Sequence, residues 1–336
     1  MQQKNYTIQA LRAVAAMMVF LSHSLMMIKN STIEWLHGTP LHFFFDGQCA
    51  VVFFMVLSGF FYYKAERFTL RKYARGIKKK VLKIYPSHVL MISIGVLLCN
   101  LALSYNADIF TEWSNSFWTQ HIGIRETIKQ MLIIVPGTDS YLVNSPVWYL
   151  VVEVRMFLLM PLLSGVLYYV RVKFNDISYY GLWTLLVIVA SFVYPFALCY
   201  LIGYLAGSVL HSLNIESKIL SNPAVLGGGF MSVLAINIRN EIQIESSVVY
   251  LLIQSLGVSS LILLCYMGKG QTSASLLARL GDYSYEFYIS HFVILLGCKS
   301  IVSDAIQFWM FAFVLTVMMT VLLRHIHNRF INRLLQ

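Results

Sequence analysis

Two ionisable side chains, Arg12 and His23, interrupt the first apolar stretch of the sequence. They are eleven residues apart, and eleven residues of an α-helix return to within about 20° of the same face, about 16 Å further along the axis. Ionisable groups in apolar helices usually face a polar cavity. The spacing therefore predicts that both side chains point into one cavity. There the imidazole of His23 could accept a proton or act as a nucleophile.

A carboxylate, Glu153, and a second histidine, His291, lie in later apolar stretches. Glu153 is expected at a depth close to that of His23, where it would orient the imidazole and stabilise its charged form. Structural roles are the alternative: Arg12 could snorkel to the membrane surface, His23 could hydrogen-bond between helices, and Glu153 could pair with Arg155. Residues two apart on a helix point to different faces, which disfavours that last pair.

A strongly basic segment, residues 64–83, is interpreted as a cytoplasmic loop and includes Arg75, Lys80 and Lys83. Its cations could simply anchor the chain to anionic lipid. They could instead hold the phosphates of a nucleotide-bearing donor. The sequence has no glycine-rich phosphate loop, so such binding would depend on side chains.

The elements that must position these residues are predicted to be membrane helices. Of the 336 residues, 58% are hydrophobic and 12% are charged, with a mean hydropathy of +0.68. This composition predicts an all-α polytopic integral membrane protein, a single domain over residues 1–336 with about ten spans. The spans are expected near residues 7–28, 43–63, 84–105, 146–170, 178–194, 195–213, 222–238, 247–267, 281–299 and 305–323. Pro195 could divide two short spans or kink one long one.

The positive charges predict the orientation. With ten spans and a cytoplasmic N-terminus, 18 of the 25 lysines and arginines fall in inside segments and five in outside loops. This excess predicts that both termini are cytoplasmic, and it accounts for the net charge of +10 without a nucleic-acid partner. The first stretch is interpreted as a retained helix, not a signal peptide. The five cysteines are dispersed, so we expect packing roles and no metal site.

Five stretches, taken in chain order, resemble the family 3 membrane acyltransferases. Arg12 to His23 is similar to that family's signature of an arginine, ten residues and a histidine. The other stretches are VFFMVLSGFF at 52–61, KKVLKIYP at 79–86, WYLVVEVRMF at 148–157 and SYEFYISH at 284–291, which resemble FFVLSGF, RRLLRIYP, WSLSVEEQFY and SYSLYLLH. The matches extend over most of the chain.

The resemblance implies an O-acyltransferase of the bacterial inner membrane. Its donor would be a cytoplasmic acyl-CoA, with acetyl-CoA expected, and its acceptor a hydroxyl of a surface polysaccharide or of its lipid-linked precursor. The residues carried over are His23, Glu153 and Arg12 for catalysis, Lys80, Lys83, Arg75 and Tyr85 for the donor, and Ser58, Tyr285 and His291 for the cavity wall. The partners would be acyl-CoA, a sugar acceptor and membrane lipids, with no metal.

The sequence departs from the family pattern in three places. Lys80 and Lys83 replace two arginines, which removes the planar guanidinium fork. Val154 replaces a second glutamate. Glu286 adds a carboxylate, which is expected to tune the site of His291.

Two other functions fit the same residues. A transporter or flippase could use Arg12, His23 and Glu153 as a proton relay, although the sequence shows no inverted repeats. A structural or partner-binding membrane protein could use them as interhelical hydrogen bonds.

Overall fold

Helices form nearly all of the regular structure. The computed structural model describes residues 5–29, 35–36, 39–62, 69–102, 109–133, 142–212, 222–237, 247–267 and 275–335. The helices are α1 (Tyr6–Met26), η1 (Pro40–Phe45), α3 (Gly47–Tyr62), α4 (Leu70–Ala102), α5 (Glu112–Asn115), α6 (Ile124–Met131), α7 (Val147–Lys173), α8 (Asp176–Val193), α9 (Ala197–Ser212), α10 (Pro223–Asn237), α11 (Ser247–Met267), α12 (Leu276–Leu280), η2 (Gly281–Tyr283), α13 (Ser284–Lys299) and α14 (Ala305–Leu335). Within those ranges the β-structure amounts to one bridge, between Ile28 and Phe110.

Each segment predicted to span the membrane is largely helical. Five helices, namely α1, α4, α7, α11 and α14, are long and apolar enough to cross a bilayer. Four shorter apolar helices, α3, α8, α9 and α10, accompany them. The chain is therefore a multi-pass membrane protein, while ten crossings and cytoplasmic termini stay predictions.

The basic segment is not a loop over most of its length. Residues 70–83 form the first four turns of α4, a helix of 33 residues that continues into the apolar segment. Lysine, arginine and leucine are good helix formers, so the charged residues extend the helix rather than end it. Lys80 and Lys83 consequently lie three residues apart on one face of a helix.

Pro195 divides two helices. α8 ends at Val193 and α9 begins at Ala197, so residues 178–212 form two helical segments. The turn is closed by a hydrogen bond of 2.8 Å from the Ala197 amide to the Tyr194 carbonyl. Proline has no amide hydrogen, which explains why the helix stops there.

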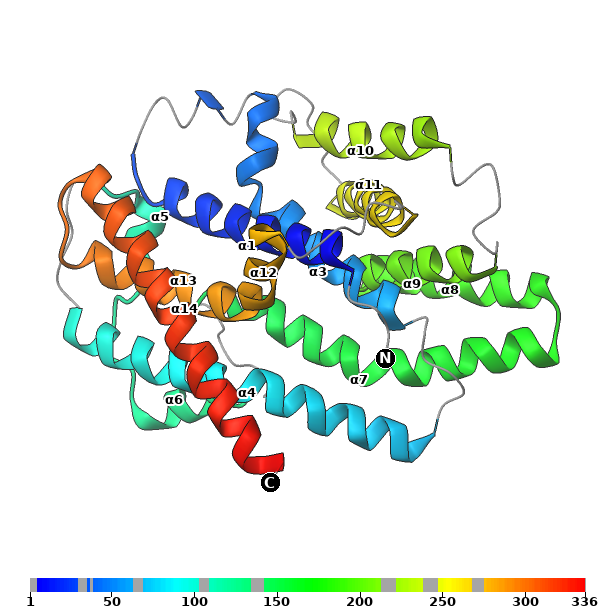
Figure 1. Cartoon of the computed structure of the whole chain (residues 1–336), viewed down its shortest axis with the longest axis horizontal. Coiled ribbons are helices and arrows are strands. Elements are labelled where there is room, and N and C mark those ends of the chain that lie inside the picture. Colours follow the sequence, from blue (N-terminus) through cyan, green and yellow to red (C-terminus); the bar gives the residue numbers. More distant parts are fainter. Residues whose placement is uncertain are drawn as a thin grey trace.

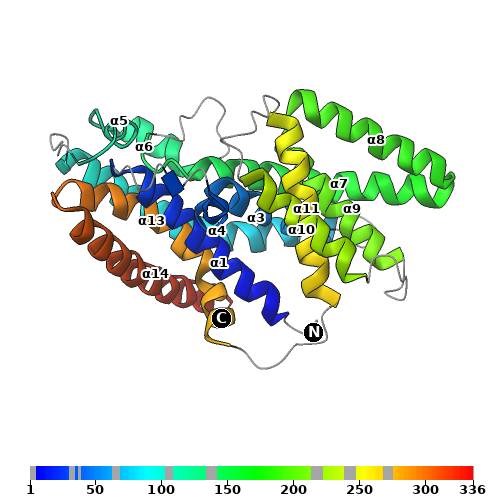
Figure 2. The same ribbon diagram turned by 90° about the horizontal axis from the view of Figure 1, so that it is seen from above.

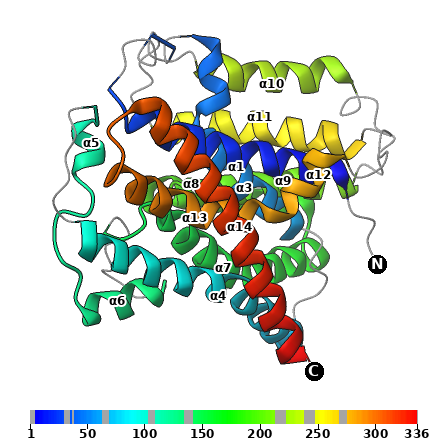
Figure 3. The ribbon, with the colours of Figure 1, turned by 60° about the vertical axis from the view of Figure 1, so that its left-hand side comes forward.

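α1 lies near the middle of the molecule and packs against α3, α11, α12 and α13 (Figure 1). The start of α1 and the end of α14 lie toward the same side (Figure 2). α5 and the connection from α13 to α14 lie on the opposite side (Figure 3). Arg12 is therefore nearer the side of the chain ends, and His23 is nearer the side of α5.

Two glycines allow α3 and α9 to cross in direct backbone contact. A Cβ atom on Gly59 would lie 2.1 Å from the Tyr200 carbonyl oxygen, and one on Gly203 would lie 2.0 Å from that of Val56. No side chain fits at either position, which is how small residues bring membrane helices together. The crossing fixes the position of Tyr200.

Candidate functional site

A cavity of about 530 Å³ opens between α1, α3, α4, α7, α9 and α13. Its wall begins at the first two turns of α1 and extends to the second turn of α13. The polar or aromatic lining residues are Asn5, Gln9, Arg12, Phe54, Ser58, Phe61, Tyr62, Lys80, Lys83, Tyr149, Glu153, Phe157, Tyr200, Ser284, Tyr285 and Tyr288. The structure thus brings together six of the sequence-predicted residues: Arg12, Ser58, Lys80, Lys83, Glu153 and Tyr285.

Three cations and one carboxylate face this cavity. Arg12, Lys80 and Lys83 outnumber Glu153, so the lining carries a net positive charge. The Arg12 guanidinium donates a hydrogen bond of 3.4 Å to the Gln9 side-chain oxygen one turn away. A cavity of this charge favours an anionic ligand.

Glu153 does not contact His23, contrary to the expectation from sequence. Its carboxylate forms an ion pair with the Lys80 ammonium and accepts a hydrogen bond from Tyr149. Tyr149 lies one turn before Glu153 on the same face of α7. The expectation failed in depth and in neighbour. Glu153 lines the cavity with Arg12 while His23 lies beyond it, and α4 brings Lys80 to Glu153, a contact that sequence cannot show.

His23 instead meets His291. Nδ1 of His23 lies 2.9 Å from Nε2 of His291, and Nδ1 of His291 lies 2.6 Å from the Tyr288 carbonyl oxygen. A carbonyl oxygen only accepts, so Nδ1 of a neutral His291 carries the hydrogen and its Nε2 is bare. His23 must then donate from Nδ1. In this arrangement Nε2 of His23 keeps its lone pair.

The histidine pair lies beyond the end of the cavity. Neither His23 nor His291 lines the cavity, whereas Tyr288, one turn before His291, does. The predictions that His23 shares a cavity with Arg12 and that His291 lines its wall are therefore wrong for this cavity. The Tyr288 ring packs edge-on against Tyr149 with centroids 5.4 Å apart, and its hydroxyl donates to the Pro146 carbonyl at 2.7 Å. These two rings therefore separate the cationic cavity from His23.

On its other side His23 is bordered by aromatic rings. Trp113 of α5 is nearly parallel to the His23 ring at 6.2 Å, and Phe292 is edge-on at 5.1 Å. α5 is held in place by hydrogen bonds of 2.9 Å from the Thr111 amide to the Met27 carbonyl and of 2.8 Å from the Lys299 ammonium to the Ser114 carbonyl. α5 thus borders the histidine pair on the side away from the cavity.

Two predicted donor residues do not line the cavity. The Tyr85 hydroxyl donates to the Leu132 carbonyl at 3.1 Å, beside α6. Arg75 is exposed. Tyr85 is two residues from Lys83, about 200° around the helix, so a helical segment cannot direct both into one cavity.

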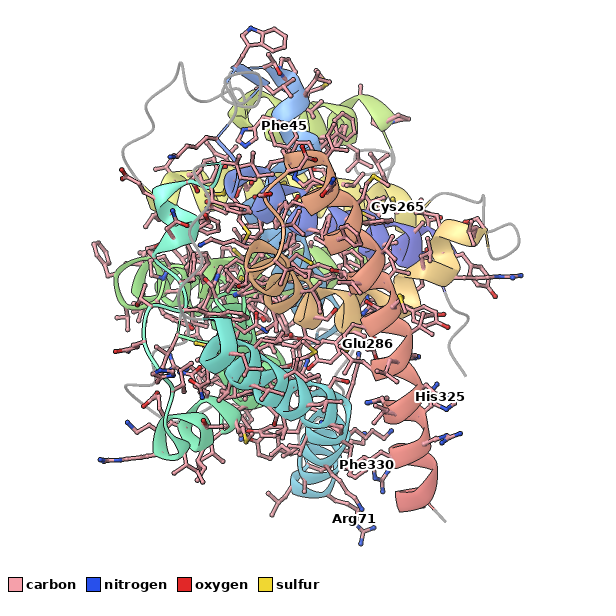
Figure 4. The ribbon with its side chains drawn as sticks, turned by 90° about the vertical axis from the view of Figure 1, so that its left-hand side faces the viewer. Phe45, Arg71, Cys265, Glu286, His325 and Phe330 are labelled. Carbon is pink, nitrogen blue, oxygen red and sulfur yellow. The ribbon has the colours of Figure 1, made fainter. Side chains whose placement is uncertain are left out.

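Glu286 pairs with a helix that sequence reasoning did not connect to it. Its carboxylate accepts from Arg324 of α14 at 3.2 Å, with the Glu286 side chain 2% exposed. Figure 4 shows Glu286 where α13 and α14 meet. Glu286 pairs with Arg324 rather than with His291, so no direct contact supports the expectation that Glu286 tunes His291.

Sequence reasoning missed the tyrosines Tyr149, Tyr200 and Tyr288. Two of them could have been found from their spacing, because residues three or four apart share a helix face. Tyr149 precedes Glu153 by four residues, and Tyr288 precedes His291 by three. Tyr200 has no such signal. Over the described ranges, no group of three or more histidine, cysteine, aspartate or glutamate residues could hold a metal ion.

The site has the parts that a group transfer from an anionic donor requires: a cationic cavity, and a histidine with a free nitrogen beyond it. Comparison with known proteins agrees with this chemistry. No curated protein and no solved structure matches the chain. The profile of the acyltransferase domain of family 3, however, matches residues 5–323. The chain therefore belongs to the family 3 acyltransferases and is a membrane acyltransferase.

Proposed function

We propose that this acyltransferase takes an acyl group, most simply acetyl, from cytoplasmic acyl-CoA. The acceptor is a hydroxyl of a surface polysaccharide or of its lipid-linked precursor, and the protein resides in the bacterial inner membrane. The observation that carries the proposal is the position of Arg12 and His23 on one helix. Arg12 lines the cationic cavity, and His23 presents a free nitrogen nearer the opposite side.

The donor phosphates bind near Arg12, Lys80 and Lys83. Lysine holds phosphate as a point charge, so this site lacks the bidentate geometry of an arginine pair. The carrier arm then extends toward the histidine pair along about 16 Å of α1. For the thioester to reach His23, the rings of Tyr149 and Tyr288 must turn aside.

His23 acts on the acceptor through Nε2. The acceptor hydroxyl gives its proton to Nε2 while its oxygen attacks the thioester carbonyl carbon. The carbon–sulfur bond breaks, the thiolate leaves, and the proton held by His23 can return to the sulfur. If the acyl group instead rests on His23, the same nitrogen is the nucleophile. In both routes His291 holds His23 in the required tautomer.

The proposal is tested in cells. Surface glycans from cells with and without the intact gene are compared for acyl esters by mass spectrometry and NMR. We expect the esters to disappear with the gene and with His23→Ala, and to persist with His325→Ala, an exposed histidine of α14. Wild-type levels of ester in His23→Ala cells, with normal membrane insertion, would refute the mechanism.

A further inference from the structure

Two hydroxyl groups of the cavity wall have no hydrogen-bond partner among the described residues. They belong to Tyr200 of α9 and Ser284 of α13, which are 0% and 2% exposed. A buried polar group without a partner is costly, and native proteins rarely retain one without a reason. A ligand in the cavity would supply the missing partners.

The position of Tyr200 is rigid. In the crossing, Gly59 of α3 lies against the Tyr200 backbone itself, and Gly203, one turn further along α9, lies against the Val56 carbonyl of α3. The Tyr200 side chain therefore cannot withdraw by separating the two helices. A fixed phenol at the wall of a cavity suits the recognition of one group of a ligand.

Tyr200 stands beside the route from the cations to the histidine pair. It lines the same cavity as Glu153, which Lys80 holds, and as Tyr149, which packs against Tyr288. A ligand that fills the cavity from Lys80 to the tyrosine rings meets this wall. The part of the ligand at this point is the arm between the phosphates and the reacting group.

We propose that the Tyr200 and Ser284 hydroxyls form a subsite for the amide groups of that arm. A hydroxyl can donate to an amide carbonyl or accept from an amide N–H, so it can bind either end of the group. A hydrocarbon chain would leave both hydroxyls unpaired, and phosphate is better served by the three cations. The subsite rests on the proposed function, since it takes the donor to be a CoA thioester.

The test divides the donor into its two halves. The full-length protein is purified into lipid nanodiscs, and calorimetry measures the binding of CoA, of pantetheine, and of the nucleotide half of CoA. Tyr200→Phe and Ser284→Ala remove one hydroxyl each. We expect each substitution to raise the dissociation constants of CoA and of pantetheine about five-fold. The dissociation constant of the nucleotide half should stay unchanged.

Two further variants make the result specific. Tyr204→Phe removes a buried phenol one turn along α9 that does not line the cavity, and it should change none of the three affinities. Lys80→Met should weaken the binding of CoA and of the nucleotide half, and it should leave the binding of pantetheine unchanged.

The failures are distinguishable. If Tyr200→Phe changes no affinity, or weakens all three ligands alike, the amide subsite is overturned while CoA binding that depends on Lys80 stands. If the wild-type protein does not bind CoA, the proposed donor is wrong, and so is the subsite proposed for it.

Discussion

At the scale of residues, the free nitrogen of His23 depends on a partner far along the chain. The Tyr288 carbonyl sets the tautomer of His291, and His291 sets that of His23. The two histidines are 268 residues apart in sequence. Spacing predicted that Arg12 and His23 point into one cavity, but only Arg12 lines it, because spacing carries no information on which helices face each residue.

We predict that His291 acts by positioning. His291→Leu leaves the Nδ1 hydrogen of His23 without an acceptor, and an unpaired buried donor costs about 1–3 kcal/mol. Acyl transfer should fall about ten- to hundred-fold, and His291→Gln, whose side-chain oxygen can accept, should recover part of it. The measurement is kcat in nanodiscs beside the affinity for CoA. Weakened CoA binding in His291→Leu would point to a structural defect instead.

If the donor is acyl-CoA, as proposed above, its phosphates must compete with Glu153 for the Lys80 ammonium group. Glu153→Gln removes the competing charge and its repulsion of phosphate. We predict a several-fold lower dissociation constant for CoA, measured by calorimetry. Glu126→Gln is the control, because Glu126 pairs with Lys129 on α6, outside the cavity lining. Weaker CoA binding in Glu153→Gln would contradict the competition.

At the scale of elements, the apolar segments were predictable and their neighbours were not. Hydropathy located the helical segments because each needs a long apolar stretch. It could not show that α4 begins at Leu70, since the charged turns are not apolar. It also could not place Lys80 beside Glu153, because that contact depends on the packing of α4 against α7.

The crossing of α3 and α9 should be intolerant of a single methyl group. Gly203→Ala places a Cβ atom against the Val56 carbonyl oxygen, and overpacking of this kind costs about 1–3 kcal/mol. We predict a lower thermal unfolding midpoint in detergent and weaker binding of CoA.

Gly227→Ala on α10 is the matched control for this crossing. No heavy atom lies within 4 Å of the added methyl group there, so stability should be unchanged or slightly raised. Equal midpoints for Gly203→Ala and wild type would contradict the close contact.

At the scale of the whole molecule, the ends of α4 and α14 lie on one side. Figure 4 shows Arg71 at one end of α4 near the end of α14 that carries His325 and Phe330. α5 lies on the opposite side (Figure 3). The excess of positive charge predicts that the side with Arg71 is cytoplasmic.

Labelling tests that orientation. In a variant without the five free cysteines, Glu112→Cys on α5 should react with an impermeant maleimide in intact cells from which the outer membrane has been removed. Arg71→Cys should react only in inverted vesicles. Both positions are exposed, so burial would not explain a difference. The reverse pattern would invert the membrane orientation and place the donor cavity outside.

The rings of Tyr149 and Tyr288 have a bioenergetic consequence. If the protein resides in the bacterial inner membrane, as proposed above, a polar path past His23 would let protons cross and discharge the gradient that the cell uses to make ATP. In the structure the cavity stops at these two rings, and the Tyr288 hydroxyl is bound to the Pro146 carbonyl. On the proposed location we expect the donor-free enzyme to be closed to protons at these rings, so that the cell could keep many copies in its membrane without losing respiratory energy.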